Sequence, residues 1–265
     1  MVLKGKEIKD LGQFAIEVIR GSGEKALSYY GKGRHQIKFD EGLVTEAEIH
    51  LTEFFKDQLQ ARFPEHQIFR NNQEDHAYTH EGKKSVWIYD PLDGVANFQA
   101  GIPIWGMSLA LIENFWPVFG VFYMPATGDL FQAQAGQKAF RGKKEIRVSA
   151  QESINDESLL LTYSRFHQHY NSTFPGKIRG LGCASAHICY VAMGRAEAAV
   201  IANEAYPGLA AACIILEAAG GKISKMDGTG FFLNEYLDGA KIDEHVLVAS
   251  PETSSQVREY LQKTS

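Results

Sequence analysis

Apolar residues recur every three or four positions between residues 5 and 30, with Lys and Glu between them. This spacing predicts an amphipathic helix at the start of the chain. A second helix is predicted from Thr45 to Arg62. Thr45 can cap its first turn, Glu48 follows three residues later, and Pro64 comes just after its end.

From about residue 67 the pattern becomes that of strands. Short runs rich in β-branched and aromatic residues alternate with Asn, Gly and Pro, which predicts strands over 67–70, 86–89, 107–112, 118–123 and 130–133. After residue 150 strands alternate with helices: strands over 159–162, 198–202 and 246–249, and helices over 184–193, 209–219 and 252–263. This order predicts a layered α/β architecture with large sheets.

Composition and charge narrow the classes of partner. Of the 265 residues, 45% are apolar and 22% are charged, which is typical of a folded globular chain. The formal net charge is −5, so no excess of positive charge points to a nucleic acid. The longest apolar run, residues 209–216, is far shorter than the roughly 20 residues that span a membrane. We therefore expect neither a nucleic-acid partner nor a membrane segment.

The cysteines and the amino terminus indicate the compartment. Cys183, Cys189 and Cys213 are odd in number and lie in apolar surroundings, which is typical of buried thiols in a reducing compartment. The first residues include no apolar signal region. We expect a cytoplasmic protein.

One segment carries the chemistry of a cation site. The run Trp87-Ile-Tyr-Asp-Pro-Leu-Asp-Gly-Val-Ala-Asn-Phe98 leads an apolar strand into two carboxylates three residues apart. Pro91 is expected to end the strand at Asp90, and Asp93 is expected to cap a short helix that starts at Gly94. Two carboxylates beside the amides of a helix start would place a hard-cation site next to an anion site. The same spacing also fits a simple rigid turn.

This segment, with Gly101-Ile-Pro103 after it, resembles the metal-binding signature of the inositol monophosphatase family. Further similar motifs follow the family's order along nearly the whole chain: Leu43-Val-Thr-Glu-Ala-Glu48, Gly120-Val-Phe-Tyr-Met-Pro125, Arg179-Gly-Leu-Gly-Cys-Ala-Ser185 and Leu209–Gly221. The resemblance implies an α/β/α/β/α fold. It would make residues 1–265 a single unit, with an α+β half to about residue 150 and an α/β half after it. It also implies a homodimer that hydrolyses a small phosphorylated polyol or sugar with Mg²⁺.

The resemblance also assigns roles to residues. Asp90 would bridge two metal ions, Asp93 would bind the second ion, and the backbone carbonyl of Leu92 would complete the first site. The amides of Gly94 and Val95 would face the phosphate. The loop of Gly182, Cys183 and Ala184 would contact the substrate.

Four positions depart from the family pattern. Asn71 stands where the family has a metal-binding Glu, and Gly208 stands where it has a metal-binding Asp. Val95 replaces a hydroxyl residue that orients the attacking water, and Glu48 replaces an Asp that helps to deprotonate it. Half of the implied carboxylate charge is lost, so we expect Mg²⁺ to bind weakly, at one site if at all.

Three nearby carboxylates could substitute for the missing ligands: Glu74, Asp75 and Glu204. His187, on an apolar helix, is interpreted as a hydrogen-bonded core residue rather than a ligand. The sequence favours a family member with weak or lost catalysis that binds a ligand or a partner. The alternatives are an active Mg²⁺-dependent phosphatase with rewired metal ligands and a metal-free structural subunit.

Overall fold

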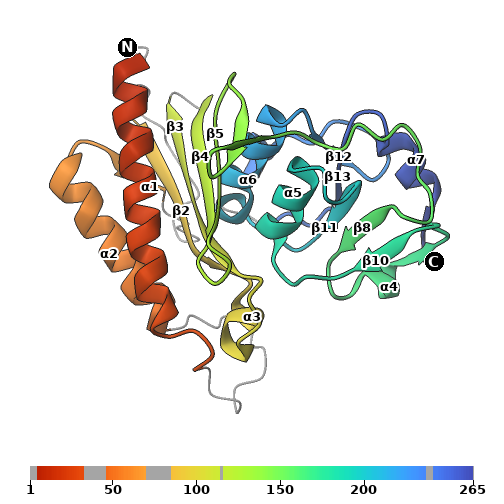
Figure 1. Ribbon diagram of the computed structural model, residues 1–265, viewed down its shortest axis with the longest axis horizontal. Helices are drawn as coiled ribbons and strands as arrows, with labels where there is room; N and C mark the ends of the chain where they lie inside the picture. The colour runs from red at the N-terminus through yellow and green to blue at the C-terminus, as the bar shows by residue number, and fades with distance from the viewer. Residues whose placement is uncertain (1–4, 33–45, 70–84, 114–115, 237–240, 265) are drawn as a thin grey trace.

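The fold consists of five alternating layers of helices and sheets (Figure 1). The computed structural model describes residues 5–32, 46–69, 85–113, 116–236 and 241–264. Two helices cover the outer face of a seven-stranded sheet, and two further helices lie between that sheet and a five-stranded one. Short helices cover the far side of the second sheet. The predicted layered α/β architecture is confirmed.

The outer helix layer is formed by α1 (Gly5–Leu27) and α2 (Glu46–Arg62). Both helices bury one apolar stripe against the first sheet: Leu11, Phe14, Ala15, Val18 and Ile19 from α1, and Ala47, Leu51, Phe55 and Leu59 from α2. Both predicted helices are present, although α1 ends at Leu27 rather than at residue 30. The proposed cap Thr45 lies outside the described residues.

The first sheet contains β1 (Gln67–Ile68), β2 (Ser85–Asp93), β3 (Gly106–Glu113), β4 (Trp116–Met124), β5 (Asp129–Gln134), β6 (Ala139–Arg141) and β7 (Lys144–Ile146). They pair in chain order, β1 with β2 in parallel and every later pair antiparallel. Side chains alternate between the two faces: Trp87 packs against α1, whereas Val86 and Ile88 face the central helices. The short hairpin β6–β7 is not among the strands that the residue pattern predicts.

The central helix layer is formed by α5 (Ala184–Ala192) and α6 (Tyr206–Ala218). Their small apolar side chains allow a close approach to the sheet. A Cβ atom added at Gly120 of β4 would lie 2.7 Å from the carbonyl oxygen of Ala211 on α6. The backbones of α6 and β4 are therefore in direct contact, and this contact places the amino terminus of α6 at the sheet.

The second sheet has the order β10 (Lys177–Arg179), β8 (Leu159–Thr162), β11 (Ala198–Ile201), β13 (Val246–Ala249) and β12 (Lys222–Lys225). The first three strands are parallel to one another, and β13 is antiparallel to both of its neighbours. Along β11, Ala199 and Ile201 face the central helices, whereas Ala198 and Val200 face the outer layer.

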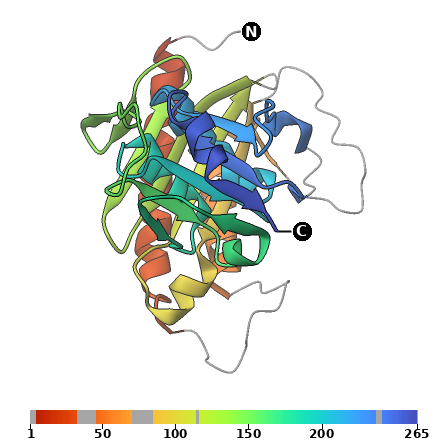
Figure 2. The ribbon, with the colours of Figure 1, turned by 90° about the vertical axis from the view of Figure 1, so that its right-hand side faces the viewer.

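The outermost elements are α4 (Phe166–His169), β9 (Tyr170–Ser172), α7 (Ser254–Glu259) and β14 (Leu261–Lys263). Figure 2 looks onto this side of the molecule. A 3-10 turn at Leu233–Tyr236 packs instead against α6. The predicted closing helix over 252–263 is wrong in length: the helix stops at Glu259, and β14 then pairs with β9. Backbone pairing with a distant strand competes there with the local helical pattern.

The buried thiols are confirmed, because Cys183, Cys189 and Cys213 are free and buried. Among the residues that the structure describes, no helix is long and apolar enough to cross a membrane. The division of the chain at about residue 150 stays a prediction.

The close contact between β4 and α6 predicts that adding one methyl group at Gly120 destabilises the protein. We expect Gly120→Ala to lower the free energy of unfolding by about 1–3 kcal/mol, because the added Cβ must displace the backbone of Ala211. The measurement is urea-induced unfolding. Gly12→Ala in α1 is the control: its Cβ would be 3.5 Å from the Phe119 ring, an ordinary contact, and Ala favours a helix. Equal stability of the two variants would contradict this account.

Candidate functional site

The site begins at a bulge in β2. This strand continues through Pro91 to Asp93, so the expectation that it ends at Asp90 is wrong. Asp90 pairs with Ser108 and Asp93 with Gly106, and the register shifts between the two pairs. Residues three apart on a regular strand face opposite sides of the sheet. The bulge removes this alternation, so both carboxylates line the same pocket.

Asp93 caps a helix, but not the predicted one. The short helix α3 (Val95–Ala100) has Gly94 as its cap residue and no side-chain cap. The carboxylate of Asp93 instead accepts hydrogen bonds from the backbone amides of Ala184 (3.2 Å) and Ser185 (2.6 Å) at the start of α5. Local sequence patterns could not predict this pairing, because the amides lie about ninety residues away along the chain. It ties the end of β2 to the central helix layer.

Asn97 holds the loops around this junction. Its side-chain amide donates to the carbonyl oxygens of Ile104 and Leu181, each at 2.6 Å. Gly182 has a φ of 74°, and a Cβ there would lie 3.0 Å from the Asn97 amide nitrogen. Only a residue without a side chain fits this close approach. Asn97 lies within the recognised signature, but sequence reasoning assigned it no role.

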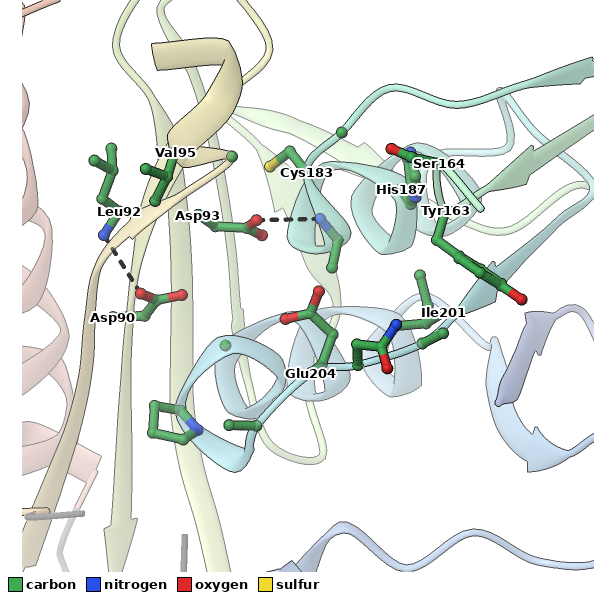
Figure 3. A pocket seen from close by; sticks show the side chains of 18 of the residues that line it. Asp90, Leu92, Asp93, Val95, Tyr163, Ser164, Cys183, His187, Ile201 and Glu204 are labelled. Atoms are coloured by element: carbon green, nitrogen blue, oxygen red, sulfur yellow. Dashed lines mark hydrogen bonds between the residues drawn. The ribbon is translucent and has the colours of Figure 1, made fainter. Parts of the chain in front are cut away.

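The pocket between the two sheets has a volume of about 490 Å³ (Figure 3). Glu204, just after β11, points into it toward the two aspartates. The walls also contain Leu92, Val95, Tyr163, Ser164, Gly182, Cys183, Ala184, His187, Ile201, Asn203, Pro207 and Gly208. Among its described lining residues, none is a lysine or an arginine.

The carboxylates of the pocket are partly buried and repel one another. Burial, together with the charges of Asp93 and Glu48, raises the pKa of Asp90 to about 7. Burial also raises the pKa of Asp93, although hydrogen bonds from Ser185 oppose the shift. Burial and the charges of both aspartates raise the pKa of Glu204 well above its ordinary value. The described part of the pocket supplies no compensating positive charge.

This donor set fits a hard cation. Carboxylate oxygens are the ligands that Mg²⁺, Mn²⁺ and Ca²⁺ prefer, and a cation would offset the concentrated negative charge. The carboxylates are not already gathered tightly: within the described residues, no group of three or more His, Cys, Asp or Glu side chains has the arrangement of a finished metal site. The pocket therefore offers an open set of oxygen donors.

The structure places most of the predicted site residues in this pocket. Asp90, Leu92, Asp93, Gly94, Val95, Gly182, Cys183, Ala184, Glu204 and Gly208 all line it. Glu48, on α2, is near enough to raise the pKa of Asp90. Asn71, Glu74 and Asp75 lie outside the described residues. The backbone amide of Ala184 already bonds to Asp93, so it is not free for a substrate.

Two further wall residues come from the second sheet and the central helices. The Tyr163 hydroxyl contacts His169 Nδ1 at 2.9 Å, and nothing in its sequence context marked it as a pocket residue. His187 accepts a hydrogen bond at Nε2 from the backbone amide of Leu181 (3.0 Å). The interpretation of His187 as a hydrogen-bonded core residue is confirmed, since its side chain is buried.

Known proteins are similar to this chain in sequence. The model of the inositol monophosphatase family matches residues 7–258. A histidinol-phosphatase from Chlorobaculum parvum is 32% identical over 219 residues, which cover 79% of this chain and 83% of the relative. A fructose-1,6-bisphosphatase/inositol-1-monophosphatase from Thermotoga maritima is 28% identical over 222 residues, covering 81% and 84%.

Solved structures agree on the fold. An IMPase from Thermotoga maritima superposes with a TM-score of 0.78 at 24% identity, covering 95% of this chain and 96% of that one. The extragenic suppressor protein suhB from Bartonella henselae gives a TM-score of 0.77 at 21% identity, covering 95% and 98%.

The two hydrogen bonds of Asn97 predict the effect of an isosteric change. In Asn97→Asp a carboxylate would face the two carbonyl oxygens that the amide now bonds. We expect the free energy of unfolding to fall by roughly 2–4 kcal/mol, as measured by chemical denaturation. Asn171→Asp, on the exposed part of β9, is the control and should change little. Similar losses in both variants would refute the role given to Asn97.

The burial of the His187 side chain predicts that the stability of the protein depends on pH. Burial lowers its pKa to about 4, so the folded protein holds it neutral while the unfolded chain protonates near pH 6.5. The contribution of neutral His187 to the free energy of unfolding is complete above pH 6.5 and is lost as the pH falls through 4. The total loss is about 3 kcal/mol.

The test compares this protein with His187→Gln, whose side-chain oxygen can still accept from Leu181. Unfolding free energies measured from pH 7 to pH 4 should fall more steeply for the unmodified protein. Parallel curves would show that His187 does not titrate in this way.

Proposed function

Because this chain belongs to the inositol monophosphatase family, we propose that its pocket hydrolyses a small phosphate monoester slowly, with the help of a divalent cation. The observation that supports this proposal is the convergence of Asp90, Asp93 and Glu204 in one pocket with no described lysine or arginine. Such a set of neighbouring, partly buried carboxylates is unfavourable without a cation. It favours an active site with changed ligands over a site that has only decayed.

In this proposal Asp90, Asp93 and the backbone carbonyl of Leu92 hold the cation, which is Mg²⁺ by family resemblance and binds weakly at one site. A bound divalent cation supplies Lewis-acid polarisation of the phosphate and stabilises charge on the leaving oxygen. Asp93 is fixed for this task by the amides of α5. The backbone around Gly94, and the loop of Gly182 and Cys183, would position the phosphate.

In this proposal the groups that activate the attacking water are less effective than the groups that hold the cation. Val95 offers no hydroxyl to the pocket. The carboxylate nearest to Asp90 on α2 is that of Glu48, which acts in this proposal as the general base. Losing an effective general base typically costs about 10²–10⁴ in rate. A turnover well below that of the family's intact sites follows from this.

The walls of the pocket restrict the substrate. The relatives are named for histidinol phosphate, inositol phosphate and fructose bisphosphate. A second phosphate would need positive charge away from the carboxylates, and the described walls provide none. They consist of neutral groups such as Tyr163, Ser164, Ile201 and Asn203. We favour the monophosphate of a polyol or an amino alcohol.

A binding protein without catalysis is the second candidate. It is favoured by the absence of a finished metal cluster among the described side chains and by the apolar positions Val95 and Gly208. Such a protein would hold a phosphorylated ligand in the same pocket. The homodimeric state remains a proposal that rests on family resemblance, and the cytoplasmic location remains one that rests on the free, buried cysteines.

The experiment is phosphate release from a panel of monophosphates and bisphosphates, with Mg²⁺ or Mn²⁺, beside Asp90→Asn. We expect turnover of at least one monophosphate that falls by 100-fold or more, roughly, in the variant, because the central ligand is lost. Turnover no higher than that of Asp90→Asn across the panel would reject hydrolysis. Thermal stabilisation by the same compounds would then identify a binding role.

A further inference from the structure

The space beside Gly208, in the first turn of α6, is occupied by another residue's carboxylate. A Cβ atom built on Gly208 would lie 3.2 Å from Oε2 of Glu204 and 3.5 Å from Oδ2 of Asp90. A side chain at position 208 would therefore extend directly into the gap between these two carboxylates. Glu204 lies where a carboxylate at position 208 would be.

The local backbone aims Glu204 into this space. Asn203 has a φ of 61°, which turns the chain sharply after β11. The carbonyl oxygen of Glu204 accepts a hydrogen bond from the amide of Ile242 (2.8 Å), and the Ser185 hydroxyl donates to the carbonyl oxygen of Gly208 (2.9 Å). Both ends of the segment 204–208 are therefore held. Figure 3 shows the resulting side chain of Glu204 pointing toward Asp90 and Asp93.

The carboxylate of Glu204 has no compensation from the described residues. None of them donates a hydrogen bond to it or forms an ion pair with it, and its nearest charged neighbours are the two aspartates. A partly buried carboxylate that faces two others is unfavourable unless a cation joins them. A structural ion pair therefore does not explain the position of this carboxylate.

We propose that Glu204 replaces the carboxylate missing at position 208 and binds the divalent cation together with Asp90 and Asp93. This inference rests on the proposed function, since it concerns the same cation. The oxygen donor stays in the same part of the pocket, but it comes from a residue four positions earlier in the chain. Positions 204 and 208 thereby become mutually exclusive: the pocket has room for one of the two carboxylates.

The first test is Mn²⁺ binding to the metal-free protein by calorimetry, with no substrate present. We expect Glu204→Gln, which keeps the side chain's size, to weaken Mn²⁺ binding by about tenfold or more. Glu217→Gln is the matched control. Glu217 is also a glutamate with a raised pKa, but it is exposed, lies near the end of α6 and does not line the pocket. It should bind Mn²⁺ as the unmodified protein does.

The second test exchanges the two positions. Glu204→Ala should bind Mn²⁺ weakly, and Glu204→Ala combined with Gly208→Asp should recover binding to within a few-fold of the unmodified protein. Gly208→Asp alone should lower the melting temperature of the metal-free protein, because its carboxylate meets that of Glu204. The metal-free Glu204→Gln variant should instead melt roughly 2–4 °C higher, since a buried charge is removed.

Asp90→Asn separates the failure of this inference from that of the proposed function. Mn²⁺ binding that is lost in Asp90→Asn but unchanged in Glu204→Gln would overturn the role of Glu204 alone. Binding that persists in Asp90→Asn, or that is absent from the unmodified protein, would overturn the proposed cation site itself. The last comparison adds Gly208→Asp to the unmodified protein and to Glu204→Ala. If it tightens Mn²⁺ binding by the same factor in both, positions 204 and 208 are independent and the proposed exchange is wrong.

Discussion

The carboxylate of Asp93 joins the end of the first sheet to the start of the central helix α5, and the pocket depends on this contact. The amides of Ala184 and Ser185 have no partner within their own helix, so a carboxylate is the natural acceptor for them. The bulge in β2 turns Asp93 and Asp90 to the same side. The hydrogen bonds of Asn97 then fix the loop that leads into α5. Together these contacts hold two separate layers at the distance that a pocket requires.

Electrostatic repulsion is the cost of this arrangement. The charge of Asp93 raises the pKa of Asp90, and the charges of both aspartates raise the pKa of Glu204, in a pocket whose described walls have no positive side chain. The packed layers around them, not their own interactions, keep them together. Sites that bind cations commonly sacrifice stability in this way, because the charges that oppose one another in the free protein become ligands in the loaded one. This gives the pocket a physical reason to retain all three groups.

A comparison by sequence position alone would count Gly208 as a lost ligand. In space, the oxygen atoms of Glu204 lie beside the place where that ligand would be. A cation responds to the position and charge of oxygen atoms, and not to the backbone position from which they extend. A family site can therefore change its residues while the pocket keeps its chemistry.

The sequence by itself determined the elements whose causes are local. The periodic apolar positions of α1 and α2, the strands β1–β5, β8, β11 and β13, and the carboxylate pair Asp90 and Asp93 were readable, because local residue patterns encode them. Predictions that treated a local signal as complete were wrong: Asp93 caps α5 rather than α3, and the last helix gives way to β14. Both corrections come from partners roughly ninety residues away along the chain.

Only the tertiary structure decided which groups meet. The bulge in β2, the clamp made by Asn97 and the approach of Glu204 to Asp90 each join segments that the sequence leaves far apart or in an undefined loop. Glu204 was one of three candidate carboxylates in the sequence, with nothing to rank it. Its proximity to Gly208 depends on the turn at Asn203 and on the backbone contact of α6 with β4. Packing between layers sets these distances, and local spacing does not encode it.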